Sequence, residues 1–183
     1  MTRTMSRFDD ATRARIDELV SRYPNKRAAL IPALWVAQDV YDGWLPEQAQ
    51  QEVADHLGVS RAEVEGVASY YTMFNKQPVG KHHIEICHNI SCMIVGADDL
   101  VHHCEKRLGI ECGDTTPDGM FTLNRAECLG ACANALAVQV GGRYYENVDT
   151  AKMDRLIDEL RRAPGRGTAA DPDQARMPEQ TKF

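Results

Sequence analysis

The chain has 183 residues, of which 43% are hydrophobic and 26% are charged, a balance typical of a globular protein rather than a disordered or fibrous one. Its 27 acidic and 21 basic side chains give a formal charge of −6, which argues against nucleic-acid binding, since that needs a basic face. The longest uninterrupted apolar stretch, Ala28–Ala37, is far shorter than the ~20 residues of a membrane-spanning helix. The N-terminus has no apolar core that would make a secretory signal. These features predict a soluble intracellular protein without direct membrane insertion.

Residues 1–78 predict a small bundle of helices. Apolar residues recur at helical spacing over residues 16–23 and again over residues 26–41, where Pro32 is expected to kink the helix or disturb its first turn. A third helix is expected over residues 46–57, because a proline opens it and a glycine follows it.

A fourth helix is predicted from a capping box, in which Ser60 and Glu63 would each satisfy a backbone N–H group at the helix start. Val64, Val67 and Tyr71 follow at helical spacing and are expected to face inward. Short connections between four helices favour a bundle. Four aromatic side chains are expected to pack it: Trp35, Tyr41, Trp44 and Phe74.

Residues 79–162 predict a second domain, because the hydrophobic pattern changes after Pro78-Val79-Gly80. The elements expected in chain order are a strand over residues 82–87, a helix over 96–108, a strand over 120–123, a hairpin of strands 136–140 and 143–146, and a helix over 150–162. A parallel βαβ unit followed by an antiparallel hairpin and a covering helix is the layout of a thioredoxin-like domain. The predicted fold class is therefore α+β or α/β.

The remaining residues, 163–183, are rich in Pro, Gly, Ala and charged side chains. This segment contains too few apolar residues to offset the entropy lost when a chain becomes ordered. It is predicted to be a disordered tail.

The six cysteines all lie in the second half of the chain. Two pairs stand out, Cys87-x4-Cys92 and Cys128-x3-Cys132. Cys87 ends one predicted strand and Cys128 follows the next, while the second cysteine of each pair lies in a loop before the next element. Adjacent parallel strands would bring both strand ends to one edge, so the four thiols are expected to converge. Four thiolates suit either a [2Fe–2S] cluster or a structural zinc ion.

The spacing of these pairs favours iron–sulfur but leaves zinc open. Zinc sites usually use Cys-x2-Cys knuckles, which are absent from both pairs. Gly130 and Ala131 are small, so backbone N–H groups can approach cluster sulfurs between Cys128 and Cys132. A thiol oxidoreductase is a third possibility, although the Cys-x-x-Cys of a thioredoxin-type dithiol is missing.

Other reactive side chains are given no role in the site. Cys104 is expected to be buried in a helix, and Cys112 falls in a turn-rich loop. The histidines lack the spacing of a Rieske centre and are expected to face solvent: His82, His83, His88, His102 and His103. No phosphate-binding loop occurs, so no nucleotide site is predicted.

With its motifs in this order along the sequence, the chain resembles the family of small iron–sulfur subunits of NADH:quinone oxidoreductase, respiratory complex I. The resemblance covers roughly residues 13–162. It is carried by both cysteine pairs, including Cys-Leu-Gly-Ala-Cys, and by three helical motifs: YPNKRAAL at 23–30, GWLP at 43–46 and EGVASYYTMF at 65–74.

The resemblance implies a helical N-terminal domain followed by a thioredoxin-like ferredoxin domain that binds one [2Fe–2S] cluster. The ligand positions that match the family are Cys87, Cys92, Cys128 and Cys132. It also implies an electron-transfer subunit with no catalytic residue of its own. Its expected partners are a flavin-bearing, NADH-binding subunit and other subunits of the peripheral arm. FMN and NADH would be bound only by the partner. The subunit itself is expected to be cytoplasmic, at the cytoplasmic face of the membrane as part of a membrane-bound complex.

One position departs from the family pattern. The family usually has Ala-Pro shortly after the last ligand cysteine, whereas this chain has Ala135-Leu136. Leucine frees φ and restores a backbone N–H donor beside the cluster loop, which affects loop geometry rather than the ligand set. The same module occurs in NAD-linked formate dehydrogenases and bidirectional hydrogenases, so an equivalent role there remains an alternative.

Overall fold

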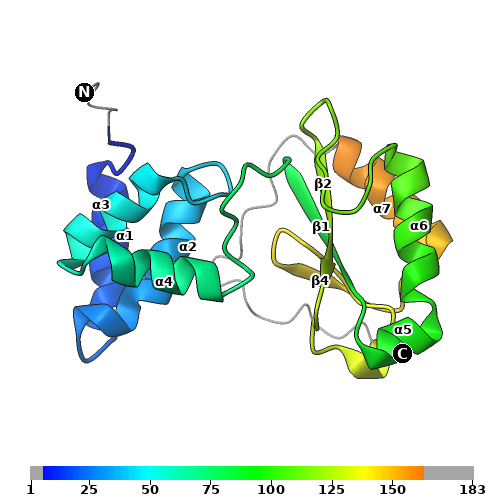
Figure 1. Ribbon diagram of the computed structural model, residues 1–183, viewed down its shortest axis with the longest axis horizontal. Helices are drawn as coiled ribbons and strands as arrows, with labels where there is room; N and C mark the ends of the chain where they lie inside the picture. The colour runs from blue at the N-terminus through cyan, green and yellow to red at the C-terminus, as the bar shows by residue number, and fades with distance from the viewer. Residues whose placement is uncertain (1–5, 163–183) are drawn as a thin grey trace. The chain divides into compact units, whose positions relative to one another are not determined.

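The computed structural model describes residues 6–162, which divide into two compact units at the junction of Pro78 and Val79 (Figure 1). The N-terminal unit is built of helices, and the C-terminal unit combines a four-stranded sheet with helices. The predicted fold class, a helical bundle followed by a mixed domain, is confirmed. The tail expected at residues 163–183 lies outside the described residues. No described helix is both long enough and apolar enough to cross a membrane.

The N-terminal unit is helical as predicted, although its first helix begins earlier, at Asp10, and ends before Tyr23, which is exposed. Its elements are α1 (Asp10–Ser21), η1 (Lys26–Ala29), α2 (Leu30–Val40), α3 (Glu47–Leu57) and α4 (Arg61–Tyr70). Pro32 lies in the first turn of α2, directly after the 3-10 helix η1, so the expected irregularity is present. The capping box of α4 is also present: the Glu63 N–H donates to the Ser60 hydroxyl at 3.3 Å, and the Glu63 carboxylate accepts from the Ser60 N–H at 3.1 Å.

The core of this unit differs from the prediction at two aromatic positions. Tyr71 is 37% exposed, because α4 ends at Tyr70 and the extended backbone beyond it leaves the helical register. Ala68 is buried in its place. Trp44 is half-buried outside the core cluster, because the turn before α3 directs its neighbour Leu45 inward instead.

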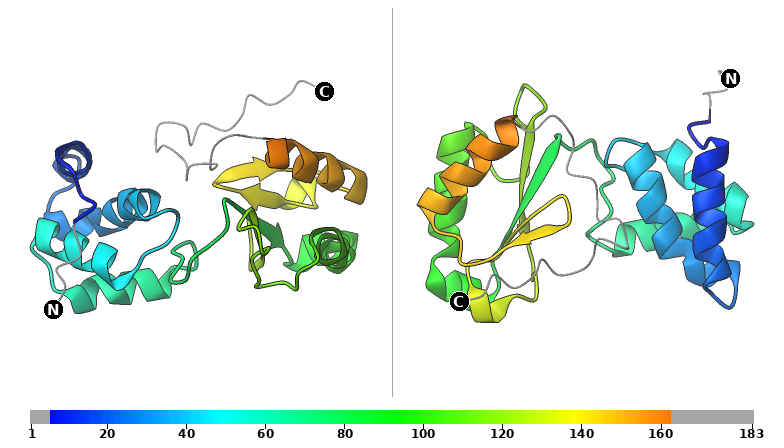
Figure 2. Two further views of the ribbon diagram at one scale, coloured as in Figure 1. Left: turned by 90° about the horizontal axis from the view of Figure 1, so that it is seen from above. Right: turned by 180° about the vertical axis from the view of Figure 1, so that it is seen from behind.

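The C-terminal unit is a mixed sheet covered by helices. Its elements are β1 (His82–Cys87), α5 (Ile90–Val95), α6 (Ala97–Leu108), β2 (Phe121–Ala126), η2 (Cys132–Asn134), β3 (Val138–Val140), β4 (Arg143–Tyr145) and α7 (Thr150–Arg162). The strand order is β2-β1-β3-β4, with β1 parallel to β2 and the other pairs antiparallel. Helices α6 and α7 lie beside each other on one face of the sheet (Figures 1 and 2).

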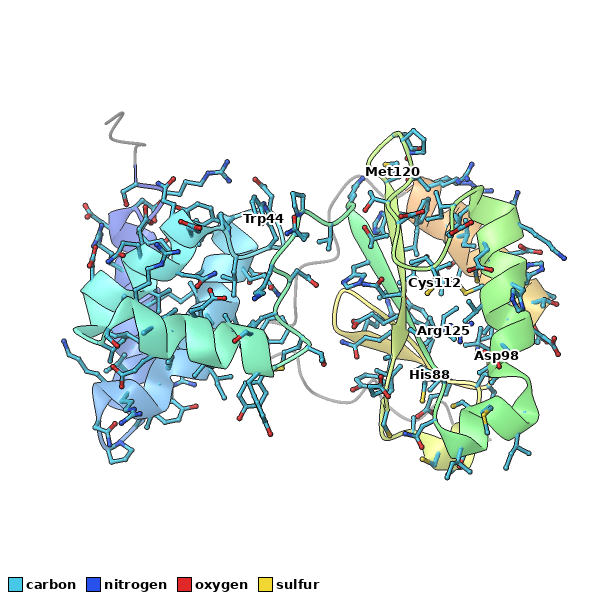
Figure 3. The ribbon with its side chains drawn as sticks, viewed as in Figure 1. Trp44, His88, Asp98, Cys112, Met120 and Arg125 are labelled. Atoms are coloured by element: carbon cyan, nitrogen blue, oxygen red, sulfur yellow. The ribbon has the colours of Figure 1, made fainter. Side chains whose placement is uncertain are left out.

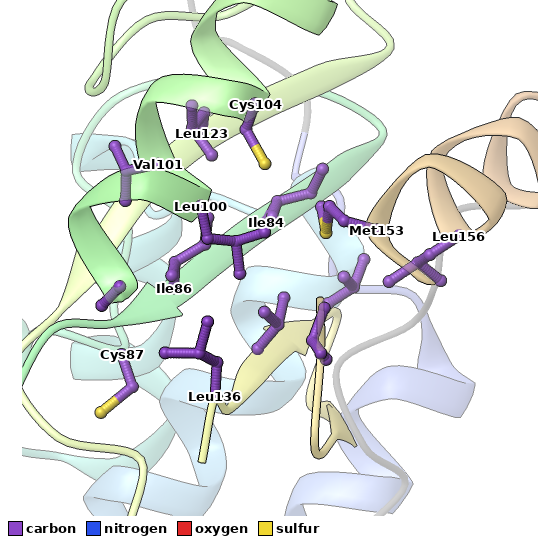
Figure 4. Close-up of a cluster of buried hydrophobic side chains, with 14 of the residues drawn as sticks. Ile84, Ile86, Cys87, Leu100, Val101, Cys104, Leu123, Leu136, Met153 and Leu156 are labelled. Carbon is purple, nitrogen blue, oxygen red and sulfur yellow. The ribbon is translucent and has the colours of Figure 1, made fainter. Parts of the chain in front are cut away.

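The core of this unit lies between that face of the sheet and the two helices. Ile84 and Ile86 of β1 are fully buried there, as the alternating pattern of the strand requires (Figure 4). Leu100 of α6 and Met153 of α7 reach the same layer. This packing holds β1 firmly in place, and with it the strand end that carries Cys87.

Three elements of the C-terminal unit differ from the prediction, the first being β3, which begins at Val138 rather than at residue 136. The strand expected over residues 120–123 is longer than predicted: β2 covers Phe121–Ala126 and therefore ends two residues before Cys128. The short helix α5 was not expected, and it changes the surroundings of Cys92. Its start and end are set by Asn89, whose side chain caps it, and by Gly96 with its positive φ.

Gly80 is the position where a side chain would disturb this unit most. It is buried, and a Cβ atom there would lie 2.8 Å from the backbone carbon of Phe121. We expect Gly80→Ala to lower the free energy of unfolding by about 1–3 kcal/mol, because neither backbone can move without disrupting the sheet. Urea denaturation measures this change.

Gly66, on the exposed side of α4, provides the matched control. A Cβ there meets nothing within 4 Å, and its φ is not in the left-handed region. Gly66→Ala should raise stability by about 0.5–1 kcal/mol. Equal stability of the two variants would contradict the close approach at Gly80.

Candidate functional site

The site begins at the ends of two parallel strands. β1 and β2 pair in register from His82↔Phe121 to Cys87↔Ala126, so their C-terminal ends lie side by side. Cys87 is the last residue of β1, and Cys128 follows shortly after β2. The N–H of His88 still donates to the Ala126 carbonyl at 3.1 Å, which continues the pairing past the strand end. The expected convergence of the two strand ends is confirmed.

The two cysteine pairs differ in how far solvent reaches them. Cys87 and Cys92 are buried, at 3% and 2% exposure, whereas Cys128 and Cys132 are exposed. Cys92 lies on α5 rather than in the predicted loop, because the short helix begins three residues after the strand. Cys132 begins the 3-10 helix η2. The site therefore has a dry side, formed by the first pair, and an open side, formed by the second.

The thiol of Cys87 lies at the centre of the group. Burial alone would raise its pKa, yet the pKa is lowered, because the backbone N–H groups of Asn89 and Leu129 donate hydrogen bonds to the sulfur. The thiols of Cys92 and Cys128 lie within hydrogen-bonding reach and act in the same direction. The Cys87 sulfur is therefore within reach of Cys92, its partner in the first pair, and of Cys128 in the second pair.

The Cys92 thiol has the opposite shift. Burial raises its pKa, and the neighbouring Cys87 raises it further, while the N–H of Ala137 favours the thiolate. The nearby charge of Cys132 also raises this pKa, so the electrostatics connect all four cysteines. Two adjacent sulfurs cannot both carry a bare negative charge at low cost, and a positive ion between them removes that penalty.

Backbone N–H groups also point to the open side of the site. The N–H of Gly130 donates to the Cys128 sulfur at 3.4 Å, from a backbone with φ of 73° that favours glycine. This agrees with the predicted role of small residues between the second pair. Further along the chain, three residues after Cys132, the peptide bond between Ala135 and Leu136 is cis.

Two local pairs of thiols make up the donor set of the site. A [2Fe–2S] cluster asks for two thiolates on each iron, which is how this chain supplies them. The N–H groups directed at sulfur are the partners that an anionic thiolate cluster needs. The residues present therefore fit the cluster.

The other two cysteines lie outside this group. Cys104 is fully buried in α6, and burial raises the pKa of its thiol to about 12, which keeps it protonated and inert. Cys112 is half-buried against the same core, and its N–H donates to the Glu105 carboxylate at 3.0 Å. Burial of Cys104 is confirmed.

Four of the five histidines do not face solvent as predicted: His82 is buried, and His83, His88 and His103 are half-buried. His82 is 2% exposed, because it starts β1 on the same face as Ile84, and its ring lies 5.6 Å from that of Phe121. His103 is half-buried on α6, where it lies 2.9 Å from the Asp154 carboxylate of α7.

His88 follows the first cysteine of the site. Its ring is 3.8 Å from the Glu127 carboxylate, which precedes the second pair. Figure 3 places His88 at the same end of the unit as Arg125 and Asp98, which form an ion pair of 3.1 Å between β2 and α6.

An exposed apolar surface beside the thiols was not predicted from the sequence. We call it the α5 patch, and it consists of side chains that are 53–76% exposed: Ile90, Met93, Ile94 and Val95. Cys92 lies within the same helix but faces inward. The signal that could have revealed α5 is an Asn, a short apolar run and a glycine in succession.

Comparison with known proteins places the whole arrangement in one family. The family model described as thioredoxin-like [2Fe–2S] ferredoxin matches residues 16–161. The chain is 46% identical to an E subunit of NADH-quinone oxidoreductase from Rhizobium meliloti over 151 residues, which is 82% of this chain and 89% of that one. It is 43% identical to the E subunit of NADH-quinone oxidoreductase from Rickettsia conorii over 155 residues, covering 84% and 93%.

A solved structure shares the same architecture. The chain matches an NAD+-reducing [NiFe]-hydrogenase in the air-oxidized state with a TM-score of 0.63 and 25% identity, over 72% of this chain and 22% of the hydrogenase chain. The module thus corresponds to a small part of a much longer polypeptide there. Taken with the sheet, the converging thiols and the extent of the family match, these comparisons show that the chain belongs to the thioredoxin-like [2Fe–2S] ferredoxin family.

Proposed function

We propose that this chain is the small electron-carrying subunit of an NADH-quinone oxidoreductase and that it holds one [2Fe–2S] cluster. The observation that supports this most is the meeting of four thiols at one edge of the sheet, with backbone N–H groups directed at their sulfurs. When bound, such a cluster accepts and passes on one electron at a time. The proposed ligands are Cys87, Cys92, Cys128 and Cys132.

The chain's own residues would hold each iron by a local pair. Cys87 and Cys92 take one iron from the buried side, where α5 and the sheet exclude water. Cys128 and Cys132 take the other from the exposed side, which leaves that side open to a partner. The chain supplies no acid, base or nucleophile to this function.

The proposed electron donor is a flavin-bearing, NADH-binding subunit of the same complex. FMN and NADH would thus be bound by the partner, because this sequence has no phosphate-binding loop of its own. The names of the curated relatives support a multi-subunit setting, and we place the chain in the peripheral arm at the cytoplasmic face of the membrane.

The alternative is that the chain carries out the same role in a different complex, as part of the NADH-oxidising unit of an NAD-linked hydrogenase. The match to the NAD+-reducing hydrogenase favours it, at 25% identity. The 46% and 43% identities to proteins of NADH-quinone oxidoreductase favour the oxidoreductase. Purifying the native complex and identifying its other subunits distinguishes the two.

The α5 patch supports a docking surface for the flavin-bearing subunit. Its four exposed apolar side chains lie in a six-residue helix that also carries Cys92. Exposed apolar patches beside a functional group commonly mark protein interfaces. A partner seated there lies close to the thiols, as short-range electron transfer requires.

Ile94, at 76% exposure, provides the test of this surface. We expect Ile94→Asp to weaken the complex with the flavin-bearing subunit at least tenfold, because a carboxylate loses its water without gaining a partner. The visible spectrum of the chain should stay unchanged, since the side chain points away from the core. Surface plasmon resonance with the co-expressed partner gives the affinity.

Tyr144→Asp is the matched control. Tyr144 is exposed at 43% on the edge strand β4, away from the strand ends that carry the thiols. Equal weakening by both substitutions, or an unchanged affinity for Ile94→Asp, would reject the α5 patch as the docking surface.

A further inference from the structure

Asn89 stands between the two cysteines of the first pair and reaches the second pair with its side chain. Its amide Nδ2 donates to the backbone carbonyl of Glu127 at 2.9 Å. Glu127 immediately precedes Cys128. This bond therefore links the segment that follows β1 to the segment that follows β2, at the point where the second pair begins.

The remaining polar groups of Asn89 serve the first pair. Its side-chain Oδ1 accepts from the N–H of Ile90 at 2.8 Å, and its carbonyl accepts from the N–H of Met93 at 2.8 Å, so it fixes the start of α5. Its own N–H donates to the sulfur of Cys87. One residue thus contacts Cys87, orients the helix that bears Cys92, and ties both to the chain before Cys128.

We infer that Asn89 is a positioning residue that fixes the separation of the two cysteine pairs. The inference rests on the proposed ligand set. Because sulfide bridges hold the two irons of a cluster at a fixed separation, the two cysteine pairs must also be held at a fixed distance from each other. Strand pairing alone fixes the segments after β1 and β2 only as far as the hydrogen bond from His88 to Ala126. Beyond that point the second pair lies in an exposed segment, which the Asn89 side chain restrains together with the Leu129 N–H at the Cys87 sulfur and the His88–Glu127 contact.

A simpler role as a helix cap predicts different behaviour under substitution. Aspartate has the size of asparagine and keeps the acceptor that caps α5, but it cannot donate to the Glu127 carbonyl. Serine also keeps a capping oxygen, without a charge, on a side chain too short to reach Glu127. If capping were the whole role, Asn89→Asp and Asn89→Ser would behave like the wild type.

The test uses the full-length chain carrying its cluster. We expect both variants to lose iron to bathophenanthroline about tenfold faster than the wild type or more, as outer partners of metal ligands commonly do when removed. Their visible circular dichroism, which reports the geometry around the irons, should shift while the far-ultraviolet spectrum stays the same. Variants that fold but never take up iron would be the stronger form of this result.

Asn25→Asp is the control for the substitution itself. Asn25 caps η1 in the N-terminal unit, where its side chain accepts from the N–H of Ala28 at 2.9 Å, and it should change neither reading. Variants of Asn89 with wild-type iron loss and wild-type visible circular dichroism would overturn the inference alone. A wild-type chain that binds no iron would overturn the proposed function and this inference together.

Discussion

Serine in place of any one of the four converging cysteines is expected to abolish or shift the visible and EPR spectra of the full-length chain. The four are Cys87, Cys92, Cys128 and Cys132. Each pair holds one iron in the proposed site, so a single loss leaves that iron with one protein sulfur. A serine hydroxyl is a poor substitute, because iron–sulfur clusters are held by thiolates. Absorption spectra and EPR of dithionite-reduced samples measure the effect.

The two remaining cysteines provide the controls. Cys104 is fully buried in the helical layer, and Cys112 packs against the same core, so neither faces the strand ends. Cys104→Ala and Cys112→Ala should leave both spectra intact, although Cys104→Ala leaves a small cavity and lowers stability by about 1–2 kcal/mol. Loss of the spectra in either control would refute the ligand set.

NADH is expected neither to bind the isolated chain nor to reduce its cluster. The sequence has no glycine-rich phosphate loop, and its formal charge of −6 disfavours binding of the phosphates of a dinucleotide. Supplying the flavin-bearing partner should restore full reduction, together with NADH-dependent reduction of ferricyanide. Anaerobic titration with NADH, followed by absorption, measures both states.

Dithionite is the internal control for that titration. It should reduce the isolated chain at once, because the exposed second pair leaves the site open to a small reductant. Bleaching by NADH alone would mean that this chain contains a nucleotide site of its own.

Much of the fold follows from local sequence signals. Strand β1 and helix α7 have the predicted bounds, because strict alternation from His82 and helical spacing up to Arg162 leave no other arrangement of their apolar side chains. The hairpin around Gly141-Gly142 and the capping box of α4 also formed as predicted. Each of these signals is short-range and requires no partner.

The differences arise where tertiary contacts decide. Tyr71 and Trp44 are large aromatic residues, whose size and apolar rings favour burial. The direction of the backbone after α4 and before α3 instead points their side chains away from the core. Strand β2 extends beyond its apolar run to Ala126, because pairing with β1 supplies hydrogen bonds that the sequence pattern does not show. The six-residue helix α5 is too short for a periodic signal.

The candidate site was predictable in part. The spacing of the cysteine pairs and the parallel strands together predicted that the strand ends would meet, and the structure brings them side by side. Which N–H groups contact the sulfurs was not predictable, since those of Leu129 and Ala137 come from segments whose path depends on the whole domain. The cross-link from Asn89 to Glu127 is likewise visible only in three dimensions. The assignment of the four ligands remains a prediction.

The metal and sulfide content of the full-length chain, purified without oxygen, tests the central claim most directly. The measurement combines iron and zinc analysis with an assay for acid-labile sulfide. A chain holding one [2Fe–2S] cluster should contain two iron atoms and two sulfides, with no zinc, in a reddish-brown sample that dithionite bleaches. A colourless protein with one zinc ion and no sulfide would contradict the account.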